Sequence, residues 1–486
     1  MRRAVAMMVL VVSGAATLAG SSSSRDQQFA GNGEQFTANE AKVDAIFAQY
    51  TQPDSPGCSV SVARDGKLLF TKGYGSADLE HNVAITPDTV FYLASVSKQF
   101  TGISIGILIQ RGVVKLDDDV RKWVPEMPDF GTTVTVSHLL HHTGGVRDFL
   151  GLQGLAGFPP DEPLTEREFL AMMSRQKALN FAPGAEHLYS NSGYALLAII
   201  VKRATTSSLK EFAAKEVLAP LGMTMSRFRD DHTEPISNRA IGYSPRNGGF
   251  RQNVPTFDVV GDGGLFSSAR ELAMWDPTDL PSTIGKAGLS QLISAPGTLN
   301  NGTSVPYAMG LRIDTYRGLP ILRHGGSYGG YQTDVTRFPG NRMGVTVLCN
   351  QSDARAWQWG QGGLAQKVAD VFFADRFTAP VPAPPPPAIP PAVPTLRTST
   401  SGNPIQATMF SEELDTSWAI SVWDGRVLLT KRNQAQLTLA RDKDADTYTS
   451  PSLTIHLTRD ASGKIIGMTA DAGEIKGIRF VALPAK

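Results

Sequence analysis

The proline-rich run at residues 379–394, A-P-V-P-A-P-P-P-P-A-I-P-P-A-V-P, most limits what this chain can fold into. Proline lacks a backbone N–H and fixes φ, so such a run can form neither a helix nor the interior of a sheet. It is typical of a stiff, extended spacer. We therefore predict a linker at residues 379–395, which separates a large unit at residues 39–378 from a small one at residues 396–486.

The first residues have the pattern of a targeting segment. Arg2 and Arg3 precede the apolar run A-V-A-M-M-V-L-V-V, and small residues follow it. This order is typical of a secretory signal, and the apolar run is short for a membrane span. We predict a signal peptide at residues 1–20 and a disordered leader at residues 21–38. The sequence thus predicts an exported protein, periplasmic or extracellular, with no membrane span.

Charge and cysteine content exclude several classes of function. The chain of 486 residues carries a net charge of +1, so nothing indicates nucleic acid as a partner. There are two cysteines, Cys58 and Cys349, and their spacing excludes a compact zinc cluster and a C-x-x-C redox motif. The oligomeric state cannot be inferred from these properties.

The large unit has strands at both ends and helices between them. Two apolar runs joined at Asp65-Gly66 predict an early hairpin. Three apolar runs after Pro306 predict late strands, and helical patterns dominate residues 130–240. The predicted fold is α+β: one antiparallel sheet flanked by helices, with a helical insert. Short strand-and-turn patterns after the linker predict a small all-β barrel or sandwich.

The stretch at residues 90–107 places a serine and a lysine close together. Ser95 and Lys98 are three residues apart, and apolar residues follow at helical spacing, which predicts both on one face of a buried helix. A lysine in an apolar wall loses its proton more easily and could activate the serine hydroxyl. S-x-x-K is a short pattern, however, and a second copy occurs at Ser207 and Lys210, in a polar run that we interpret as surface.

A cluster of histidines at His138, His141 and His142 raises the question of a metal. No acidic residue accompanies these histidines in an H-E-x-x-H arrangement, and H-T-G-G is typical of a helix end that runs into a loop. We therefore predict no metal site here, and no other cofactor.

Three motifs in a fixed order produce a resemblance. S-V-S-K at Ser95 is followed by Y-S-N at Tyr189 and by H-G-G at His324. In this order they resemble the class C β-lactamase and D-alanyl-D-alanine carboxypeptidase superfamily, which includes D-aminopeptidases and secreted esterases. The resemblance covers roughly residues 40–375 and implies the serine β-lactamase-like fold. The small C-terminal unit resembles a β-domain often appended to such hydrolases.

The resemblance implies a role for each matching residue. Ser95 would be the nucleophile, and Lys98 would share the proton transfer. Tyr189 would be the second proton-transfer group, which requires nearby cations such as Lys98 and His324 to stabilise its phenolate. Asn191 would donate to the substrate backbone. The backbone N–H groups of Ser95 and Ser327 would form the oxyanion hole.

The third motif departs from the β-lactamase pattern. True β-lactamases have Lys-Thr-Gly or Lys-Ser-Gly there, whose lysine and hydroxyl help to bind the substrate carboxylate. Here His324 is a weaker, pH-dependent cation, and Gly325 and Gly326 follow it. The resemblance then favours D-aminopeptidase-like and esterase-like members. The expected substrates are esters, D-amino-acid amides or peptides of the DD-peptidase type, including peptidoglycan fragments.

Three alternatives stay open. The chain could be a true class C-like β-lactamase, or a penicillin-binding sensor or cell-wall binding module that is acylated without turnover. A different enzyme class is suggested by G-G-S-Y-G at residues 325–329, a literal G-x-S-x-G with Ser327 as nucleophile. That motif needs a helix after the serine, whereas a β-like run follows it here.

The resemblance also bears on the cysteines. Cys58 begins the first predicted strand and Cys349 ends the last of the late strands. In the resembling fold these strands are antiparallel neighbours, which implies that a Cys58–Cys349 disulfide is possible. Two separately buried thiols are the alternative.

Overall fold

The computed structural model describes residues 33–484, except 53, 160–161, 355, 357–361, 382–403 and 424. The predicted signal peptide, residues 21–32 of the leader and most of the proline-rich linker lie outside the described residues. No helix in the described part of the chain is long and apolar enough to cross a membrane.

The larger unit is built on one antiparallel sheet of six strands assembled from both ends of the unit, as predicted. The strand order is β12-β13-β14-β15-β1-β2. The bounds are β1 Cys58–Arg64, β2 Lys67–Tyr74, β12 Arg312–Tyr316, β13 Leu319–Tyr328, β14 Tyr331–Phe338 and β15 Met343–Cys349. β1 and β2 join at Asp65 and Gly66, whose φ angles of 51° and 71° suit a tight hairpin. All seven residues of β15 are buried, because helices cover both faces of the sheet.

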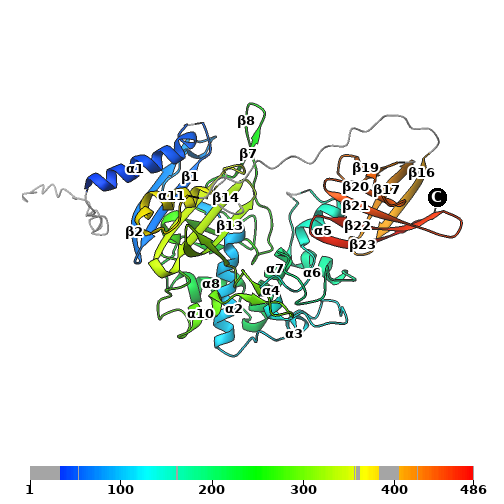
Figure 1. Cartoon of the computed structure of the whole chain (residues 1–486), viewed down its shortest axis with the longest axis horizontal. Helices are drawn as coiled ribbons and strands as arrows, with labels where there is room; N and C mark the ends of the chain where they lie inside the picture. Colours follow the sequence, from blue (N-terminus) through cyan, green and yellow to red (C-terminus); the bar gives the residue numbers. More distant parts are fainter. Residues whose placement is uncertain are drawn as a thin grey trace, which may run out of the picture.

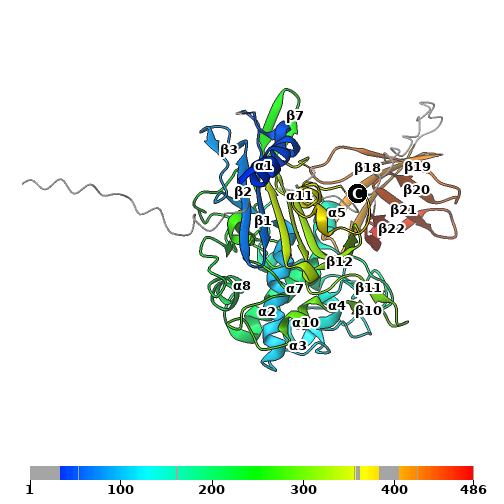
Figure 2. The same cartoon turned by 60° about the vertical axis from the view of Figure 1, so that its left-hand side comes forward.

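One face of the sheet is covered by the two ends of the unit. Helices α1 Gly33–Phe47 and α11 Leu364–Phe372 pack together there, as Figure 2 shows. Val43, Phe47 and Val368 are buried with strand residues in a separate hydrophobic cluster. The predicted disordered leader therefore ends too late, since residues 33–38 already belong to α1. Phe47 at the other end of α1 stacks on Tyr74 of β2, which holds the helix against the sheet.

The opposite face carries the helical half of the unit. Its centre is α2 Lys98–Gln110, which is surrounded by the rest of the unit, because residues from Lys98 to Leu108 are all buried. The surrounding helices are α3 Val120–Trp123, α4 Val136–Leu140, α5 Phe149–Ala156, α6 Glu166–Ser174, α7 Asn191–Thr205, α8 Leu209–Ala213, α9 Ala269–Leu272 and α10 Leu289–Ser294.

Short strands connect the two halves. A three-stranded sheet in the order β5-β9-β6 lies beside α2 and is formed by β5 Val90–Tyr92, β6 Arg227–Phe228 and β9 Leu265–Ser268. Three hairpins, each made of two short strands of two to four residues, complete the unit. They are β3 Ser76–Asp78 with β4 Val83–Ala84, β7 Tyr243–Arg246 with β8 Gly249–Gln252, and β10 Gly297–Thr298 with β11 Ser304–Val305.

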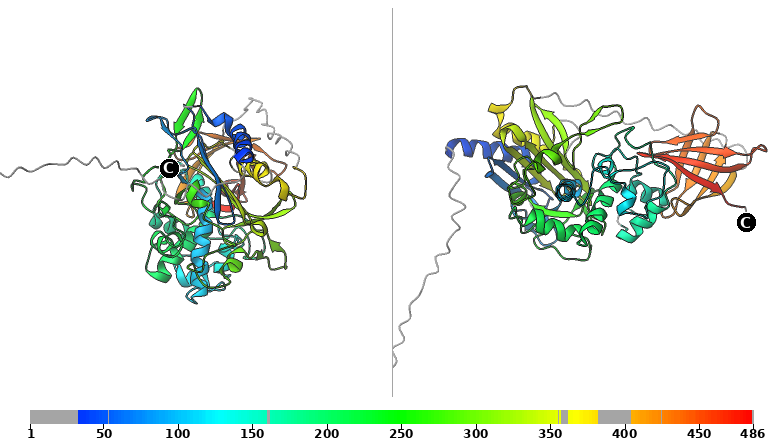
Figure 3. Two further views of the ribbon diagram at one scale, coloured as in Figure 1. Left: turned by 90° about the vertical axis from the view of Figure 1, so that its left-hand side faces the viewer. Right: turned by 90° about the horizontal axis from the view of Figure 1, so that it is seen from below.

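The smaller unit is a closed barrel of eight antiparallel strands, one of the two predicted forms. Its strands are β16 Ile405–Ser411, β17 Thr416–Trp423, β18 Arg426–Thr430, β19 Leu437–Arg441, β20 Thr447–Ser450, β21 Leu453–Arg459, β22 Ile465–Ala472 and β23 Ile475–Ala482. Burial alternates along β17, so Trp418, Ile420 and Val422 point inward. Figure 1 and the right-hand view of Figure 3 show the barrel docked against α5 and α6.

The late strands differ in number from the prediction. The second apolar run after Pro306 contains two strands, β13 and β14, because Gly329 and Gly330 turn the chain with φ angles of 56° and 80°. Glycine adopts such angles more readily than any other residue. Ser327 therefore lies at the end of a strand that enters a hairpin turn, and no helix follows it. This arrangement does not fit the α/β-hydrolase nucleophile elbow.

Candidate active site

Ser95 lies in a strained turn between β5 and α2. The prediction placed it on the same buried helix as Lys98, but the structure puts it in a single 3₁₀ turn, Ala94–Ser97, and α2 begins at Lys98. The cause is Ala94, which has φ of +48°. A residue with a Cβ pays for this conformation, and such strain is typical of functional turns. The turn leaves Ser95 half-buried while its neighbours on both sides are buried.

Lys98 is fully buried and directed at Ser95. Its Nζ donates to Ser95 Oγ at 3.2 Å and to the carbonyl oxygen of Asp262 at 2.8 Å. It also donates to Asn191 Oδ1 at 2.7 Å. Burial lowers the pKa of Lys98 to about 8, and the nearby carboxyl groups of Asp262 and Asp148 limit that decrease. The lysine is thus within reach of the serine proton, and its pKa is low enough for a fraction of it to be neutral at physiological pH.

Asn191 is held from the far side by Asp148, which the sequence did not single out. The backbone N–H of Asn191, the first residue of α7, donates to Asp148 Oδ2 at 2.6 Å. Asp148 also caps α5 by accepting from the N–H groups of Leu150 and Gly151. Burial raises the pKa of Asp148, and its hydrogen bonds oppose that effect. In the sequence, Asp148 is recognisable only as an aspartate in the N-cap position before an apolar run, a pattern that marks the start of a helix and does not indicate a catalytic role.

Tyr189 lies over Lys98 and is hydrogen-bonded to Ser95. Lys98 Nζ is 4.8 Å from the centre of the Tyr189 ring. Burial raises the pKa of Tyr189 well above its ordinary value of 10, and the hydrogen bond with the Ser95 side chain only partly offsets this. The structure thus holds a neutral phenol next to Ser95, because burial outweighs the stabilisation of a phenolate that the predicted proton-transfer role would require.

His324 of β13 is neutral, which corrects the prediction of a pH-dependent cation. Its Nδ1 lies 2.7 Å from the carbonyl oxygen of Gly325 and its Nε2 lies 2.8 Å from the hydroxyl of Tyr307. A carbonyl can only accept, so Nδ1 carries the proton and Nε2 accepts from Tyr307. Burial lowers the pKa of His324 to about 3, and the charge of Lys98 adds to this effect.

Gly326 lets β13 approach the turn that carries Ser95. A Cβ at this position would lie 2.2 Å from the carbonyl oxygen of Leu93 and 2.5 Å from Thr333 Oγ1. The Thr333 hydroxyl donates to the same Leu93 carbonyl at 2.9 Å, which ties β14 to this turn. Ser327 follows Gly326 and is exposed. The third motif thus lies beside the turn that contains Ser95.

The three clustered histidines have separate local roles. His138 Nδ1 accepts from Thr135 N at 3.2 Å in a capping box, and His141 Nδ1 donates to the Ser137 carbonyl at 2.9 Å. His142 Nδ1 accepts from the backbone N–H of Ser190 at 3.1 Å, and its ring lies 4.3 Å from that of Tyr189. His142 therefore supports the Tyr189 loop, a role that the sequence did not indicate.

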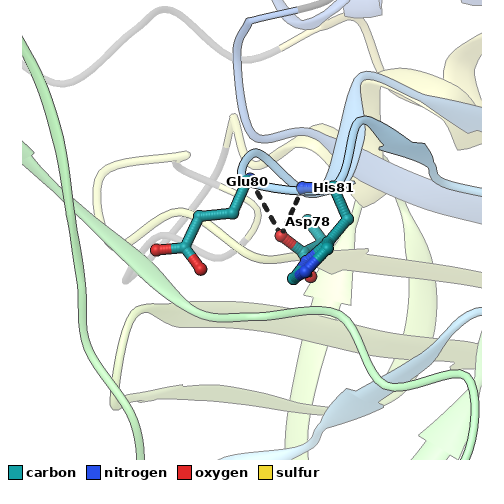
Figure 4. A group of neighbouring side chains, drawn as sticks. All are labelled: Asp78, Glu80 and His81. Atoms are coloured by element: carbon teal, nitrogen blue, oxygen red, sulfur yellow. Dashed lines mark hydrogen bonds and ion pairs between the residues drawn. The ribbon is translucent and has the colours of Figure 1, made fainter.

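Two other groups of acidic residues and histidine occur in the described part of the chain: Asp78 with Glu80 and His81, and Asp231 with His232 and Asp258. In the first, shown in Figure 4, Asp78 accepts from the backbone N–H groups of Glu80 and His81 and pairs with the His81 ring at 2.7 Å. These bonds close an exposed turn between β3 and β4 and engage the side chains of Asp78 and His81, whereas Glu80 takes part through its backbone N–H.

Cys58 and Cys349 form a disulfide. They are direct partners in the register of β1 and β15, at the end where β1 begins and β15 finishes. The bond joins residues 291 positions apart, so it ties neighbouring strands from the two ends of the larger unit together.

Comparisons with known proteins identify the family. The family model described as Beta-lactamase matches residues 43–358. A D-aminopeptidase of Gluconobacter oxydans is 27% identical over 318 residues, which cover 65% of this chain and 59% of that protein. The chain thus spans about three fifths of the length of this relative.

Solved structures show the same fold. The octameric penicillin-binding protein homologue from Pyrococcus abyssi has a TM-score of 0.58 at 22% identity, covering 93% of this chain and all of that one. The D-amino acid amidase from Ochrobactrum anthropi, solved with D-phenylalanine, has a TM-score of 0.57 at 21% identity, covering 70% of this chain and all of that one. The family model covers well over half of the chain, and together with the motifs and the sheet it shows that the chain belongs to the beta-lactamase family.

Proposed function

We propose that this protein is a serine hydrolase that forms an acyl-enzyme on Ser95 and cleaves amides of D-amino acids or short D-amino-acid peptides. Esters are the second substrate class. The observation that carries the proposal is the contact between Lys98 Nζ and Ser95 Oγ, 3.2 Å apart, in a site where burial brings the pKa of the lysine to about 8. A base with a pKa near the working pH is effective in proton transfer.

The proposed reaction has two stages. Ser95 Oγ attacks the carbonyl carbon while its proton passes to Lys98 Nζ, and the C–N bond then breaks as the amine leaves with a proton. Water attacks the resulting ester in the second stage and restores the serine. Tyr189, a neutral phenol bonded to Ser95, would give its proton to the leaving amine and take one from the protonated Lys98, so that the serine proton ends on the amine and Lys98 is neutral again. The backbone N–H groups of Ser95 and Ser327 would bind the oxyanion, and Asn191 the substrate backbone.

The third motif supports this substrate class over β-lactams. A neutral His324 and the side-chain-free Gly325 offer no positive charge to the carboxylate that β-lactams carry. A D-amino-acid amide lacks that carboxylate, so the absence of a positive charge at this position does not weaken its binding. The D-aminopeptidase relative supports the same class. The protein would act after export, on a small-molecule or peptide substrate.

Hydrolysis of D-alanine amide and L-alanine amide, a short aryl ester and a cephalosporin would test the proposal. We expect turnover of the D-amide and the ester, little turnover of the L-amide, and weak or no hydrolysis of the cephalosporin. A cephalosporin cleaved faster than the D-amide and the ester would favour a β-lactamase. A stable acyl adduct without turnover of any substrate would favour a penicillin-binding sensor.

A further inference from the structure

A buried ion pair joins the barrel to the helical half of the larger unit. Arg147 Nη1 pairs with Glu413 Oε2, and the two side chains are only 1% and 3% exposed. Glu413 lies in the turn between β16 and β17, 266 positions along the chain from Arg147. Its neighbour Glu412 is exposed and pairs with Lys177 at the surface. The buried pair is thus a specific contact within a wider interface.

Both charged groups are further bonded across the interface. Glu413 Oε2 accepts from the backbone N–H of Lys177 at 2.9 Å, and Arg147 Nη2 donates to the carbonyl oxygen of Lys476 at 2.8 Å. A buried pair with this many partners fixes the position of both side chains, and removal of one partner leaves a buried charge uncompensated.

Arg147 belongs to the turn that positions the second motif. Its carbonyl oxygen accepts from Ser192 Oγ at 2.8 Å, and the same hydroxyl accepts from Phe149 N at 2.8 Å. Asp148, between them, accepts from the backbone N–H of Asn191 at 2.6 Å. Three successive residues, beginning with Arg147 of the ion pair, are therefore bonded to the start of α7.

From the start of α7 the contacts continue to the nucleophile. Asn191 Oδ1 accepts from Lys98 Nζ at 2.7 Å, and Lys98 Nζ is 3.2 Å from Ser95 Oγ. We propose that Glu413 of the barrel is a positioning residue for the reaction at Ser95, acting through Arg147 on the turn at residues 147–149 that holds Asn191 and thereby Lys98. The inference rests on the proposed role of Ser95 as nucleophile. It makes the barrel part of the functional enzyme.

The remainder of the interface provides a matched control. At the other end of α5, Thr416 Oγ1 donates to the carbonyl oxygen of Ala156 at 3.1 Å, and Trp418 Nε1 donates to that of Leu155 at 3.0 Å. Thr416 is buried in the same interface but does not touch the turn at residues 147–149. Loss of its hydroxyl weakens docking without disturbing Arg147.

The test compares Glu413→Gln and Glu413→Ala with Glu412→Gln and Thr416→Val in the full chain. For each variant, kcat and KM for D-alanine amide and the rate of Ser95 labelling by a fluorophosphonate are measured from pH 6 to 10. Misplacement of a catalytic group by about 1 Å can cost about 100-fold. We expect both Glu413 variants to lose between about 10-fold and about 100-fold in kcat and labelling rate, with KM changed by less than about 2-fold.

The pH dependence adds a readout that a purely structural role would not move. Asn191 Oδ1 stabilises the charged form of Lys98, so its displacement should lower the pKa of Lys98 and move the midpoint of the labelling profile to lower pH. Both control variants should keep the wild-type midpoint and rates within about 2-fold. An equal loss in Thr416→Val and Glu413→Gln would overturn the inference, because docking in general would then be responsible.

The two proposals fail in distinguishable ways. If the wild type is labelled at Ser95 but cleaves no D-amide, the substrate assignment fails, and the labelling rates still test Glu413. If Ser95 is not labelled at all, the proposed function fails and the inference falls with it. If Glu413→Ala does not fold, Glu413→Gln decides, since it keeps the size of the side chain. Wild-type rates and midpoint in Glu413→Gln would contradict the inference.

Discussion

The hydroxyl of Tyr307 donates to His324 Nε2 over 2.8 Å, and His324 Nδ1–H donates to the carbonyl oxygen of Gly325. Neither ring nitrogen therefore has a free lone pair that could take up a second proton. The residue that replaces the lysine of the third motif is therefore a fixed neutral group. Its ring is 6.1 Å from that of Tyr189, so it shapes the site without adding charge to it.

Because His324 is buried in its neutral form, the stability of the folded protein should decrease in acid. The pKa of His324 is lowered from 6.5 to about 3 in the folded chain, so below pH 6.5 the unfolded chain binds a proton that the native one does not. Stability therefore decreases as pH falls from 6.5 toward 3. When the pH is lowered from 7 to 5, the free energy of unfolding should decrease by about 2 kcal/mol less in His324→Gln than in the wild type.

Urea unfolding at the two pH values measures this difference. His81→Gln is the control, because His81 is exposed and the Asp78 carboxylate raises its pKa instead of lowering it. The control should retain the full acid sensitivity of the wild type. Equal acid sensitivity in His324→Gln and the wild type would show that the ring is not held neutral.

The pKa of Lys98, lowered to about 8 by burial, predicts the pH dependence of acylation. Lys98 can accept the Ser95 proton only when neutral, so the labelling rate should rise with pH through about 8 and level off above it. Lys98→Arg keeps a permanent charge and should lower the rate by at least about 100-fold.

The second S-x-x-K copy supplies the control for this prediction. Lys210 pairs with Asp230 at 3.2 Å and Glu234 at 2.6 Å, so Lys210→Arg should leave the rate and its profile unchanged. A labelling rate that stays flat from pH 6 to 10 would argue against Lys98 as the base.

The close approach of Gly326 to the Ser95 turn predicts a loss of activity on a small substitution. In Gly326→Ala the new Cβ would meet the carbonyl oxygen of Leu93 at 2.2 Å, so β13 or the turn must shift. We expect Ser95 labelling to slow by about 100-fold. In Gly340→Ala, a Cβ meets nothing within 4 Å, and labelling should stay at the wild-type rate. Similar rates in both variants would show that the contact is unimportant.

The Cys58–Cys349 disulfide should contribute measurably to stability. The two cysteines close a loop of 291 residues, so removing the bond increases the freedom of the unfolded chain. The double variant Cys58→Ala/Cys349→Ala should lose about 2–5 kcal/mol in free energy of unfolding, and reductant should affect only the wild type. Two free thiols in unfolded, unreduced wild-type protein would refute the bond.

Much of the fold follows from local sequence patterns. The Asp65-Gly66 turn fixed one hairpin, and the strand patterns at both ends of the larger unit indicated one antiparallel sheet. Such patterns depend on turn chemistry and on alternation within a few residues. The start of α1 at Gly33 was missed, because the polar residues there show no helical period and the helix is held by Phe47, far along it.

The parts of the site that the sequence did not reveal depend on distant contacts. Asp148 and Asp262 each approach Lys98 from a different loop, and neither stands in a motif. The neutral state of His324 depends on Tyr307 and on burial, which no local pattern reports. The Arg147–Glu413 pair requires the docking of two units separated by the proline-rich linker.

The most direct measurement of the central claim is the site of covalent labelling by a fluorophosphonate, found by intact mass and peptide mapping. The account predicts a single adduct on Ser95 in the wild type, the same adduct in Ser327→Ala, and no adduct in Ser95→Ala. Labelling that persists in Ser95→Ala and disappears only in Ser327→Ala would contradict it.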